Sequence, residues 1–535
     1  KYNIGVSSGN YRIKFKNMPQ YVYKLPMNVK QKVLLIVLDG LGAAPMSEGN
    51  AVVMANPDKL SALWNIYPHT YLLASGEAVG LPKNVRGNSE VGHLNLGAGS
   101  TVMQTLPRIN KAIEKGLLAN NNILTEAVIH ARRYSSKIHL VGLLSDGSVH
   151  SHIDHFKAVV DYLSKTNLEN EVYIHAITDG RDCPPQSALN YLLDIDKYCI
   201  ERGVGKIGTF IGRYYGMDRN NKWDRTQEAY FLLQNNTGER YKTYQEAISS
   251  YYQQNLTDEF FPATVINDSK VEKNDVLIML NFRPDRSLQL ARAITDDKFI
   301  NFQRTKIENL FFASMIEYAR GFPSKILFPK QYLNLPLGKV IDSFGLRQLR
   351  IAESEKFPHV TYFFNGGTSA IFQGEDRILI PSPNVPTYDL KPEMSAPQLA
   401  DILVKRISSK MYDFILVNFA NPDMVGHTGN LAAGIKAIST VDSLVHELVQ
   451  NFISTGGAVI ITADHGNAEE MINLETKAID TEHSLNPVPC IIAGTDITQK
   501  NLPYGALKDI APTILEIMGI TKPAEMNGQS LIRRI

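Results

Sequence analysis

Residues 33–40 read VLLIVLDG, an unbroken apolar run that ends in an aspartate and a glycine. A run of six apolar residues, half of them β-branched, is typical of a strand buried on both faces. Asp39 therefore stands where a central strand is expected to end. Comparable runs recur along the chain, at 138–144, 172–177, 207–211, 276–280, 310–314, 414–418 and 459–462.

Segments with helical periodicity separate these runs, at 125–134, 154–164, 187–202, 285–294, 396–408 and 434–454. Strands that alternate with helices predict an α/β fold with parallel sheets covered by helices. In such sheets ligands bind at the carboxyl ends of the strands. We therefore expect the functional side chains in the loops that follow the strands.

The composition excludes several classes of protein. The 535 residues carry 55 Lys+Arg and 54 Asp+Glu, so no global charge favours nucleic acid or a membrane surface. No apolar run approaches the roughly 20 residues of a membrane-spanning helix. Three cysteines, Cys183, Cys199 and Cys490, are no disulfide framework and favour a reducing compartment, hence the cytoplasm. Residues 1–26 lack the apolar centre of a signal peptide and are expected to be an extension without chemistry.

Two kinds of loop follow the predicted strands. Loops near residues 39, 89, 423, 464 and 483 carry Asp and His, whereas loops between about 145 and 290 carry Arg. The acidic loops lie at both ends of the chain and the basic loops lie between them. This order predicts a second α/β domain, residues 104–331, inserted into a first domain made of residues 27–103 and 332–535.

The acidic loops hold three aspartates and three histidines: Asp39, Asp423, Asp464, His427, His465 and His483. A single Asp after a strand is as readily a helix cap or a turn former. Its recurrence at three strand ends, together with three histidines, favours a dinuclear site for Mn²⁺, Zn²⁺ or a similar ion. Two divalent ions and three carboxylates leave a formal charge of +1, which favours an alkoxide or a phosphoryl oxygen.

Residues 86–99, RGNSEVGHLNLGAG, place one serine, Ser89, among glycines and asparagines. We expect a loop of tight turns here, in which the glycines allow close backbone approach. A serine hydroxyl is a poor nucleophile at pH 7 unless a base or a metal takes its proton. Ser89 is therefore the predicted nucleophile of a metal-assisted phosphoryl transfer.

The basic loops hold five arginines: Arg181, Arg213, Arg219, Arg283 and Arg286. An isolated arginine is most often a solvated surface charge. Each of these falls in or just after a predicted strand end, however, and guanidinium groups bind carboxylates and phosphates in bidentate fashion. The predicted inserted domain is therefore expected to bind an anionic substrate.

Long motifs carry a resemblance to cofactor-independent phosphoglycerate mutase, within the wider alkaline phosphatase superfamily. They include VLLIVLDGLG, GNSEVGHLNLGAG, DGRDCPP, GRYYGMDRNNKWDR, NFRPDR, NFANPDMVGHTG and TADHGNAE, and they follow that family's order over nearly all of the chain after residue 26. The resemblance implies an alkaline-phosphatase-like metal-binding domain with an inserted phosphotransferase domain. Leu41 and Ser148 depart from residues common in the family, Trp and Gly, but neither is an expected ligand.

The same resemblance implies the site residues. One metal is held by Asp423, His427 and His483, and the other by Asp39, Ser89, Asp464 and His465. Substrate contacts fall to His150, Arg181, Asp182, Arg213, Arg219, Arg283, Arg286 and Lys356, with Arg283 and Arg286 on the phosphate and Arg181 with Asp182 on the glycerate. The implied cofactors are two Mn²⁺, with Mg²⁺, Co²⁺ or Zn²⁺ possible, and no 2,3-bisphosphoglycerate.

The implied activity is the interconversion of 3- and 2-phosphoglycerate in glycolysis by a monomer that binds neither nucleic acid nor membrane. Ser89 would take the phosphoryl group, and the retained glycerate would take it back on its other hydroxyl while the lobes exclude water. His150, Asp182 and Asp39 remain candidates for moving protons. His152 and His155 are expected to begin a helix rather than to form a third metal site.

Two alternatives accompany this interpretation. A metal-dependent phosphomonoesterase would use the same core, but hydrolysis needs no pocket that retains glycerate, so the arginine-rich insertion disfavours it. A catalytically inactive relative would bind only a metal or a partner, and the presence of every expected ligand type disfavours that reading.

Overall fold

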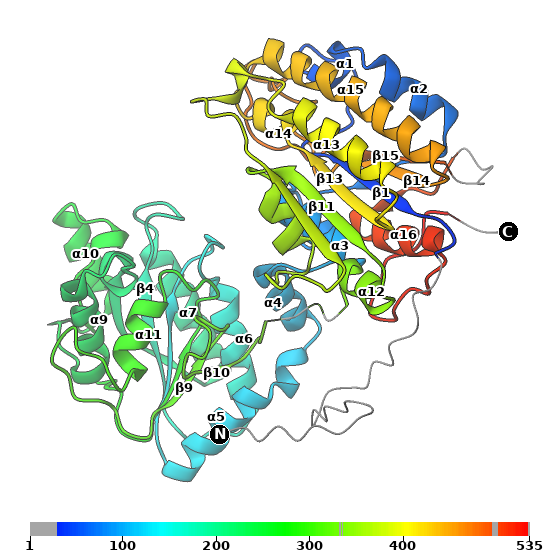
Figure 1. Ribbon diagram of the computed structural model, residues 1–535. Helices are drawn as coiled ribbons and strands as arrows, with labels where there is room; N and C mark the ends of the chain where they lie inside the picture. Colours follow the sequence, from blue (N-terminus) through cyan, green and yellow to red (C-terminus); the bar gives the residue numbers. More distant parts are fainter. Residues whose placement is uncertain (1–28, 331–332, 334, 495–500, 533–535) are drawn as a thin grey trace, which may run out of the picture. The chain divides into compact units, whose positions relative to one another are not determined.

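The computed structural model describes residues 29–330, 333, 335–494 and 501–532. Contacts divide the chain into two compact units, with boundaries after Met103 and at residues 331–332 (Figure 1). Unit 1 holds the chain before and after these boundaries, and unit 2 holds the residues between them. The extension expected at residues 1–26 lies outside the described residues.

Unit 1 is built on a sheet whose described strands follow the order β12-β11-β13-β1-β14-β15-β2-β16. The strands are β1 (Val33–Leu38), β2 (His69–Leu73), β11 (Gln348–Glu353), β12 (Glu375–Ile380), β13 (Phe414–Phe419), β14 (Ala458–Thr462), β15 (Val488–Ala493) and β16 (Gly505–Ala506). β1, which the apolar run at 33–38 predicted, lies at the centre and is buried along its whole length. It pairs in parallel with β13 on one side and β14 on the other.

The alternation of strands and helices predicted a parallel sheet. The sheet of unit 1 is not wholly parallel. β15 runs antiparallel to both β14 and β2. The segment that leads into β15 therefore lies at the edge where β14 ends, because antiparallel neighbours exchange their ends. This reversal matters for the site, since it places residues before β15 beside residues that follow β14.

Helices cover both faces of this sheet. They are α1 (Ala51–Met54), α2 (Asp58–Ile66), α3 (Ser89–Ala98), α12 (Leu337–Ser343), α13 (Ala396–Ser408), α14 (Asn421–Gly426), α15 (Leu431–Ser454) and α16 (Ile510–Met518). The long helix α15 packs with α1, α2, α13 and α14 on one face, and α3 packs with α12 and α16 on the other (Figure 1). The apolar residues between these layers form one continuous core.

Unit 2 has its own sheet, whose described strands follow the order β10-β9-β8-β3-β4-β5-β7-β6. The strands are β3 (Ile138–Leu143), β4 (Val172–Thr178), β5 (Lys206–Gly212), β6 (Glu239–Arg240), β7 (Thr264–Val265), β8 (Val276–Met279), β9 (Phe311–Ser314) and β10 (Lys325–Ile326). The central strands β8, β3, β4 and β5 are mutually parallel, so their carboxyl ends meet at one edge.

The helices of unit 2 are α4 (Thr105–Glu114), α5 (Asn122–Tyr134), α6 (Ile153–Ser164), α7 (Ala188–Arg202), α8 (Arg213–Gly216), α9 (Trp223–Asn235), α10 (Tyr244–Gln253) and α11 (Leu288–Thr295). Two apolar cores flank the sheet, one against α5, α6, α7 and α10 and one against α9 and α11. Within the described part of the chain, no helix is both long and apolar enough to cross a bilayer.

Candidate metal centre and arginine cluster

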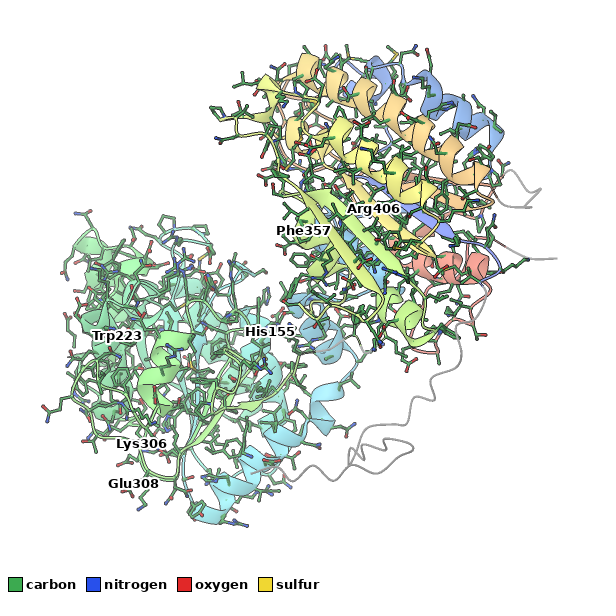
Figure 2. All side chains as sticks on the ribbon, in the orientation of Figure 1. His155, Trp223, Lys306, Glu308, Phe357 and Arg406 are labelled. Atoms are coloured by element: carbon green, nitrogen blue, oxygen red, sulfur yellow. The ribbon has the colours of Figure 1, made fainter. Side chains whose placement is uncertain are left out.

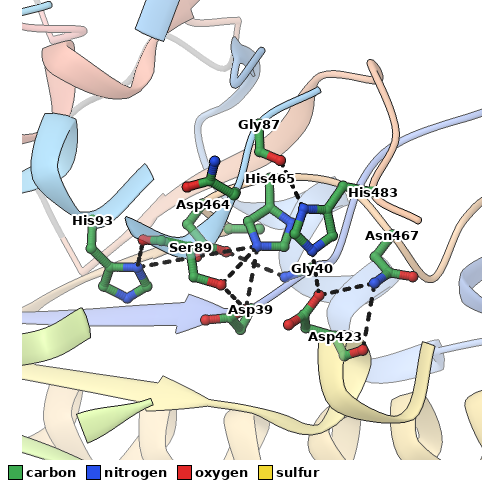
Figure 3. A network of polar contacts seen from close by, with 12 residues as sticks. Asp39, Gly40, Gly87, Ser89, His93, Asp423, Asp464, His465, Asn467 and His483 are labelled. Atoms are coloured by element: carbon green, nitrogen blue, oxygen red, sulfur yellow. Dashed lines mark hydrogen bonds and ion pairs between the residues drawn. The ribbon is translucent and has the colours of Figure 1, made fainter. Parts of the chain in front are cut away.

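Three aspartates of unit 1 meet at one edge of the sheet because they follow three adjacent parallel strands. Asp39 directly follows β1, Asp423 lies on α14 just beyond β13, and Asp464 comes two residues after β14. Each is at most 1% exposed. Figure 3 shows the three carboxylates in one polar network.

The first group of candidate ligands joins Asp423 with two histidines. His427 ends α14 one turn beyond Asp423, and His483 lies before the antiparallel β15. Their Nε2 atoms lie 3.2 and 3.3 Å from Asp423 Oδ1. Each Nδ1 contacts a backbone carbonyl, Thr481 for His427 and Gly87 for His483, which fixes both rings with Nε2 towards the carboxylate.

The second group joins Asp39, Asp464 and His465, all fully buried. His465 Nε2 lies 3.5 Å from Asp39 Oδ1 and 3.7 Å from Asp464 Oδ2. Ser89 Oγ donates a hydrogen bond to Asp39 Oδ1 at 3.1 Å and lies 3.0 Å from His465 Nε2. The structure thus brings the predicted nucleophile to the carboxylate and imidazole of this group (Figure 3).

The segment around Ser89 is a helix rather than the expected loop of tight turns. Ser89 is the first residue of α3, and the side chain of Asn88 caps the helix by accepting a hydrogen bond from the Val91 amide. Two glycines in the motif serve packing instead of turns. A Cβ on Gly92 would lie 2.5 Å from the Asp464 carbonyl oxygen, and one on Gly97 would overlap the Phe364 carbonyl oxygen.

Lys356 lies among the candidate metal ligands and is buried. Its Nζ donates hydrogen bonds to Asp39 Oδ1 at 2.7 Å, Ser89 Oγ at 2.8 Å and Asp423 Oδ2 at 2.5 Å. Burial alone would lower the pKa of Lys356, but the three aspartates outweigh it and raise that pKa. The ammonium group therefore touches both ligand groups and the serine at once.

The donor set fits divalent cations. Three buried carboxylates face a single buried ammonium group, so the cluster keeps an excess of negative charge. Asp464 Oδ2 is buried and accepts no hydrogen bond, although His93 Nδ1 lies 3.1 Å away. Burial and the Asp464 charge raise the pKa of Asp39. Paired carboxylates and imidazoles without sulfur are ligands that Mn²⁺, Zn²⁺ and similar ions accept.

Sequence reasoning missed the residues that orient these ligands. Asn418 Nδ2 donates to Asp39 Oδ2 at 2.6 Å, and Asn467 Nδ2 donates to Asp423 Oδ1 at 2.9 Å. His93 lies on α3 with Nδ1 2.9 Å from the Ser89 carbonyl oxygen and Nε2 3.1 Å from Asn418 Nδ2. Both asparagines could have been found from their positions in the sequence, because one lies inside β13 and the other just after TADHG.

The predicted substrate residues of unit 2 also gather at the carboxyl edge of a sheet. Arg213 follows β5, is only 2% exposed, and donates from Nη1 to Asp179 at 2.5 Å and to Asp182 at 2.6 Å. Asp179 follows β4 and was not predicted as a site residue. The DGRD motif that contains it was the signal, because both of its aspartates hold Arg213.

Asp285 holds a second set of these residues together. Its carboxylate lies 2.8 Å from Arg219 Nη1, 3.2 Å from Arg283 Nε and 3.7 Å from His150 Nδ1. Burial, followed by the Arg213 charge, lowers the pKa of His150 to about 4, so this imidazole stays neutral at pH 7. Asp285 was not predicted, although it lies inside the NFRPDR motif.

Arg286 faces the other arginines of the cluster. Its Nη1 donates to the Met217 carbonyl at 3.2 Å. Burial, with the charges of Arg219, Arg213 and Arg181, lowers the pKa of Arg286. Arg181 is exposed and lies 3.6 Å from Glu259. Like charges that face one another in this way are ready to accept an anion.

The remaining histidine predictions concern the start of a helix in unit 2. His152 is the N-cap of α6 and accepts a hydrogen bond from the Asp154 amide. His155 is buried in α6 and contacts Asn110 at 2.8 Å. Both therefore begin and pack the helix, as expected, and neither belongs to the metal-ligand groups found among the described residues.

Comparisons with known proteins agree on one family. The family described as "Metalloenzyme superfamily" matches this chain over residues 31–522. Two relatives named 2,3-bisphosphoglycerate-independent phosphoglycerate mutase are similar over most of their length. The protein of Symbiobacterium thermophilum is 47% identical over 94% of this chain and 98% of its own, and that of Clostridium novyi is 48% identical over 94% and 100%.

A solved structure agrees with these relatives. The crystal structure of Leishmania mexicana phosphoglycerate mutase at low cobalt concentration superposes with a TM-score of 0.57 and 29% identity, over 93% of this chain and 97% of that one. The chain belongs to the metalloenzyme superfamily and, within it, to the 2,3-bisphosphoglycerate-independent phosphoglycerate mutases, enzymes that interconvert 3- and 2-phosphoglycerate.

Proposed function

We propose that this chain interconverts 3- and 2-phosphoglycerate through a phosphoserine on Ser89, next to two Mn²⁺ ions, as a cytoplasmic monomer. The observation that carries the proposal is the position of Ser89 Oγ, which contacts Asp39, His465 and Lys356 within 3.1 Å. A lone hydroxyl with a carboxylate, an imidazole and an ammonium group around it has the partners that an activated nucleophile needs.

Asp39, Asp464 and His465 would hold one ion, and Asp423, His427 and His483 would hold the other. When bound, the ions supply charge that favours the deprotonated serine and offsets the negative charge of the transferring phosphoryl group. Mg²⁺, Co²⁺ and Zn²⁺ also suit these ligands, and we choose Mn²⁺ because the set combines carboxylate and imidazole and contains no thiolate.

Ser89 begins the transfer. Its hydroxyl proton already points to Asp39 Oδ1, which is placed to accept it as Oγ attacks phosphorus. The Oγ–P bond forms, the bond from phosphorus to the O3 of phosphoglycerate breaks, and O3 takes up the proton that Asp39 received from Ser89, so that glycerate leaves as an alcohol. Lys356, whose pKa is raised, stays protonated beside Ser89 Oγ and stabilises the oxygens of the phosphoryl group.

The arginine cluster of unit 2 retains glycerate between the two half-reactions. Arg213, fixed by Asp179 and Asp182, presents a preoriented guanidinium, while Arg219 and Arg283 are held by Asp285. The retained glycerate turns so that its O2 hydroxyl attacks the phosphoserine. The O2–P bond forms, the Oγ–P bond breaks and the O2 proton passes to Ser89 Oγ, which restores the serine hydroxyl and gives 2-phosphoglycerate. The proposal requires both groups of residues to act on one substrate molecule.

The direct test combines metal removal with a substitution. Chelation should abolish isomerisation of 3-phosphoglycerate, and Mn²⁺ should restore it better than the other three ions. Ser89→Ala should show no turnover even with Mn²⁺, while Ser100→Ala, a buried serine of the same unit, should retain it. Rapid quench with phosphate-labelled substrate should label the wild-type protein at Ser89 and leave the variant unlabelled.

Each contrary result removes a defined part of the proposal. Turnover by Ser89→Ala would reject the nucleophile, and turnover after complete chelation would reject the metals. Release of inorganic phosphate without 2-phosphoglycerate would assign a phosphomonoesterase instead. Sedimentation at working concentration tests the monomer, and fractionation of the source cell tests the location.

A further inference from the structure

Unit 2 contains a cavity of about 1000 Å³ that includes none of the predicted substrate residues. It lies between the C-terminal end of α11, the loop that leads to β9, and the segment from Ala319 to Lys325. Its volume is at the upper end of the range for small-molecule sites. Two of the residues on this side of unit 2, Lys306 on the cavity wall and Glu308 beyond it, project from the loop before β9 (Figure 2).

The walls of the cavity carry an excess of positive charge. Five lysines and arginines line it against two carboxylates, Asp296 and Asp297. Local contacts already use both carboxylates, because Asp297 pairs with Lys306 and Asp296 accepts the Lys298 amide at 2.9 Å. A ligand that enters the cavity therefore meets cations more readily than anions.

Three of these cations have no counter-ion. Arg292, Lys298 and Arg320 make no ion pair or side-chain hydrogen bond with any residue that the structure describes, whereas Lys325 pairs with Glu126 at 2.6 Å. A single unpaired surface cation is ordinary, but three that line one cavity are an electrostatic focus for an anion. Two of them are arginines, whose planar guanidinium groups bind phosphate in bidentate fashion.

Aromatic rings complete the cavity wall. Phe322 is half-buried there, and His130 packs against Phe311 with ring centroids 5.4 Å apart. An apolar wall beside unpaired cations suits a ligand that carries both phosphate groups and a flat ring system. Inorganic phosphate alone would leave most of the volume and the rings unused.

The cavity is separate from the arginine cluster at the sheet edge. Arg286 lies just before the start of α11, whereas Arg292 lies in its last turn. Six positions separate the two arginines, which corresponds to roughly 9 Å along a helix axis, and at about 100° per residue they project from different faces. Arg286 does not line the cavity, so the cavity and the arginine cluster are distinct places in unit 2.

We propose that this cavity is a second ligand site, which binds a phosphorylated small molecule of nucleotide size through Arg292, Lys298 and Arg320. The site is independent of the isomerisation proposed above. Its ligand class follows from unpaired guanidinium groups, an aromatic wall and a volume too large for phosphoglycerate.

Calorimetric titration of the full-length protein with ATP and with tripolyphosphate, in excess Mg²⁺, tests this site. Both probes should bind, ATP more tightly, and Arg292→Ala with Arg320→Ala should weaken both at least tenfold. The matched control is Arg133→Ala with Arg240→Ala, two exposed arginines of unit 2 outside the cavity, which should change neither affinity. Arg286→Ala and saturating 3-phosphoglycerate should also leave ATP binding unchanged.

Four results would overturn the proposal. They are the absence of binding by both probes, displacement of ATP by 3-phosphoglycerate, unchanged affinity in the Arg292 and Arg320 double variant, and equal losses in the control pair. Tripolyphosphate that binds as tightly as ATP would contradict the proposal that the ligand carries a flat ring system as well as phosphate groups. Circular dichroism and retained isomerase activity of the double variant show that a lost affinity does not come from unfolding.

Discussion

Lys356 Nζ lies 2.8 Å from Ser89 Oγ and simultaneously contacts Asp39 and Asp423, one carboxylate from each candidate ligand group. In the chain, Lys356 is 317 positions from Asp39, 267 from Ser89 and 67 from Asp423, and these residues meet at the sheet edge of unit 1. A buried cation at this place has two effects. It offsets part of the charge of three aspartates, and it holds the serine hydroxyl near them.

Lys356→Met should lower kcat by roughly 10²- to 10³-fold, as loss of one preorganised donor does in other enzymes. The cause is the lost cation beside the phosphoryl oxygens, so KM should change less than kcat. Steady-state kinetics with saturating Mn²⁺ measures both. Lys339→Met, at a partly exposed lysine of α12 paired with Asp342, is the control. A variant that retains half of wild-type kcat would contradict the role given to Lys356.

Arg286→Ala should lower kcat/KM for 3-phosphoglycerate roughly ten- to hundredfold, the range expected for one charge-assisted hydrogen bond. The melting temperature should not fall, because Arg286 faces other arginines and its removal relieves repulsion in the free protein. Kinetics and a thermal melt on the same sample check the two halves. Arg133→Ala should affect neither quantity, and an equal loss there would point to a general charge effect.

Gly97→Ala should lower the free energy of unfolding by about 1–3 kcal/mol, because its Cβ would overlap the Phe364 carbonyl oxygen where α3 packs. The control separates overlap from backbone strain. Gly321 has φ +72° and nothing within 4 Å of an added Cβ, so Gly321→Ala should cost about 1–2 kcal/mol from conformation alone. Because Gly97 lies in unit 1 and Gly321 in unit 2, chemical denaturation should show the transition of unit 1 shifted by the first substitution and the transition of unit 2 shifted by the second.

The stability of unit 1 should depend on pH through Glu353, at the end of β11. Burial raises the pKa of Glu353 to about 7, well above its ordinary value of 4.5, and its Oε2 has no hydrogen-bond partner. Between these two values the unfolded chain loses the proton that the folded chain keeps. Stability contributed by the protonated form is therefore complete below pH 4.5 and is lost as pH rises to about 7.

Glu353→Gln removes this loss of stability at high pH, because the amide does not ionise. It also keeps an oxygen for the Ser395 amide, which donates to Glu353 Oε1 at 2.9 Å. The free energy of unfolding should rise by roughly 2–4 kcal/mol at pH 8 and change little at pH 4. Urea denaturation at both pH values measures it. Glu447→Gln, on the exposed side of α15, should show no such pH dependence. Equal effects of Glu353→Gln at both pH values would refute the mechanism.

The apolar pattern predicted the central strands of both units because a strand that is buried on both faces is apolar at nearly every position. The run 33–38 is β1 with the same bounds, and 138–144 and 276–280 each differ from β3 and β8 by one residue. The prediction failed where a strand buries polar groups. β11 (QLRIAE) is fully buried, yet Arg350 lies inside it, bonded to Gln348 and against the ring of Phe364.

The apolar pattern also did not predict strand β15, near the edge of the unit 1 sheet. β15 carries Pro489, which argues against a strand, and it was found only because β14 and β2 flank it in antiparallel pairing. This pairing places His483 at the sheet edge where the parallel strands end. The motif TEHSLNPVP alone did not predict that position. Likewise, Asn88 and the glycines of 86–99 indicated a loop, whereas packing against Asp464 and Phe364 makes the segment a helix.

The sequence by itself determined the residue types of the site, the order of strands and helices, and the division into acidic and basic loops, since these depend on local pattern and motif. Only the tertiary structure decided which atoms meet. It joined Lys356 to Ser89, fixed both histidine rings through backbone carbonyls, and assigned Asp179 and Asp285 to the arginines. Distances between residues far apart in the chain depend on strand register and direction, and no local pattern encodes those.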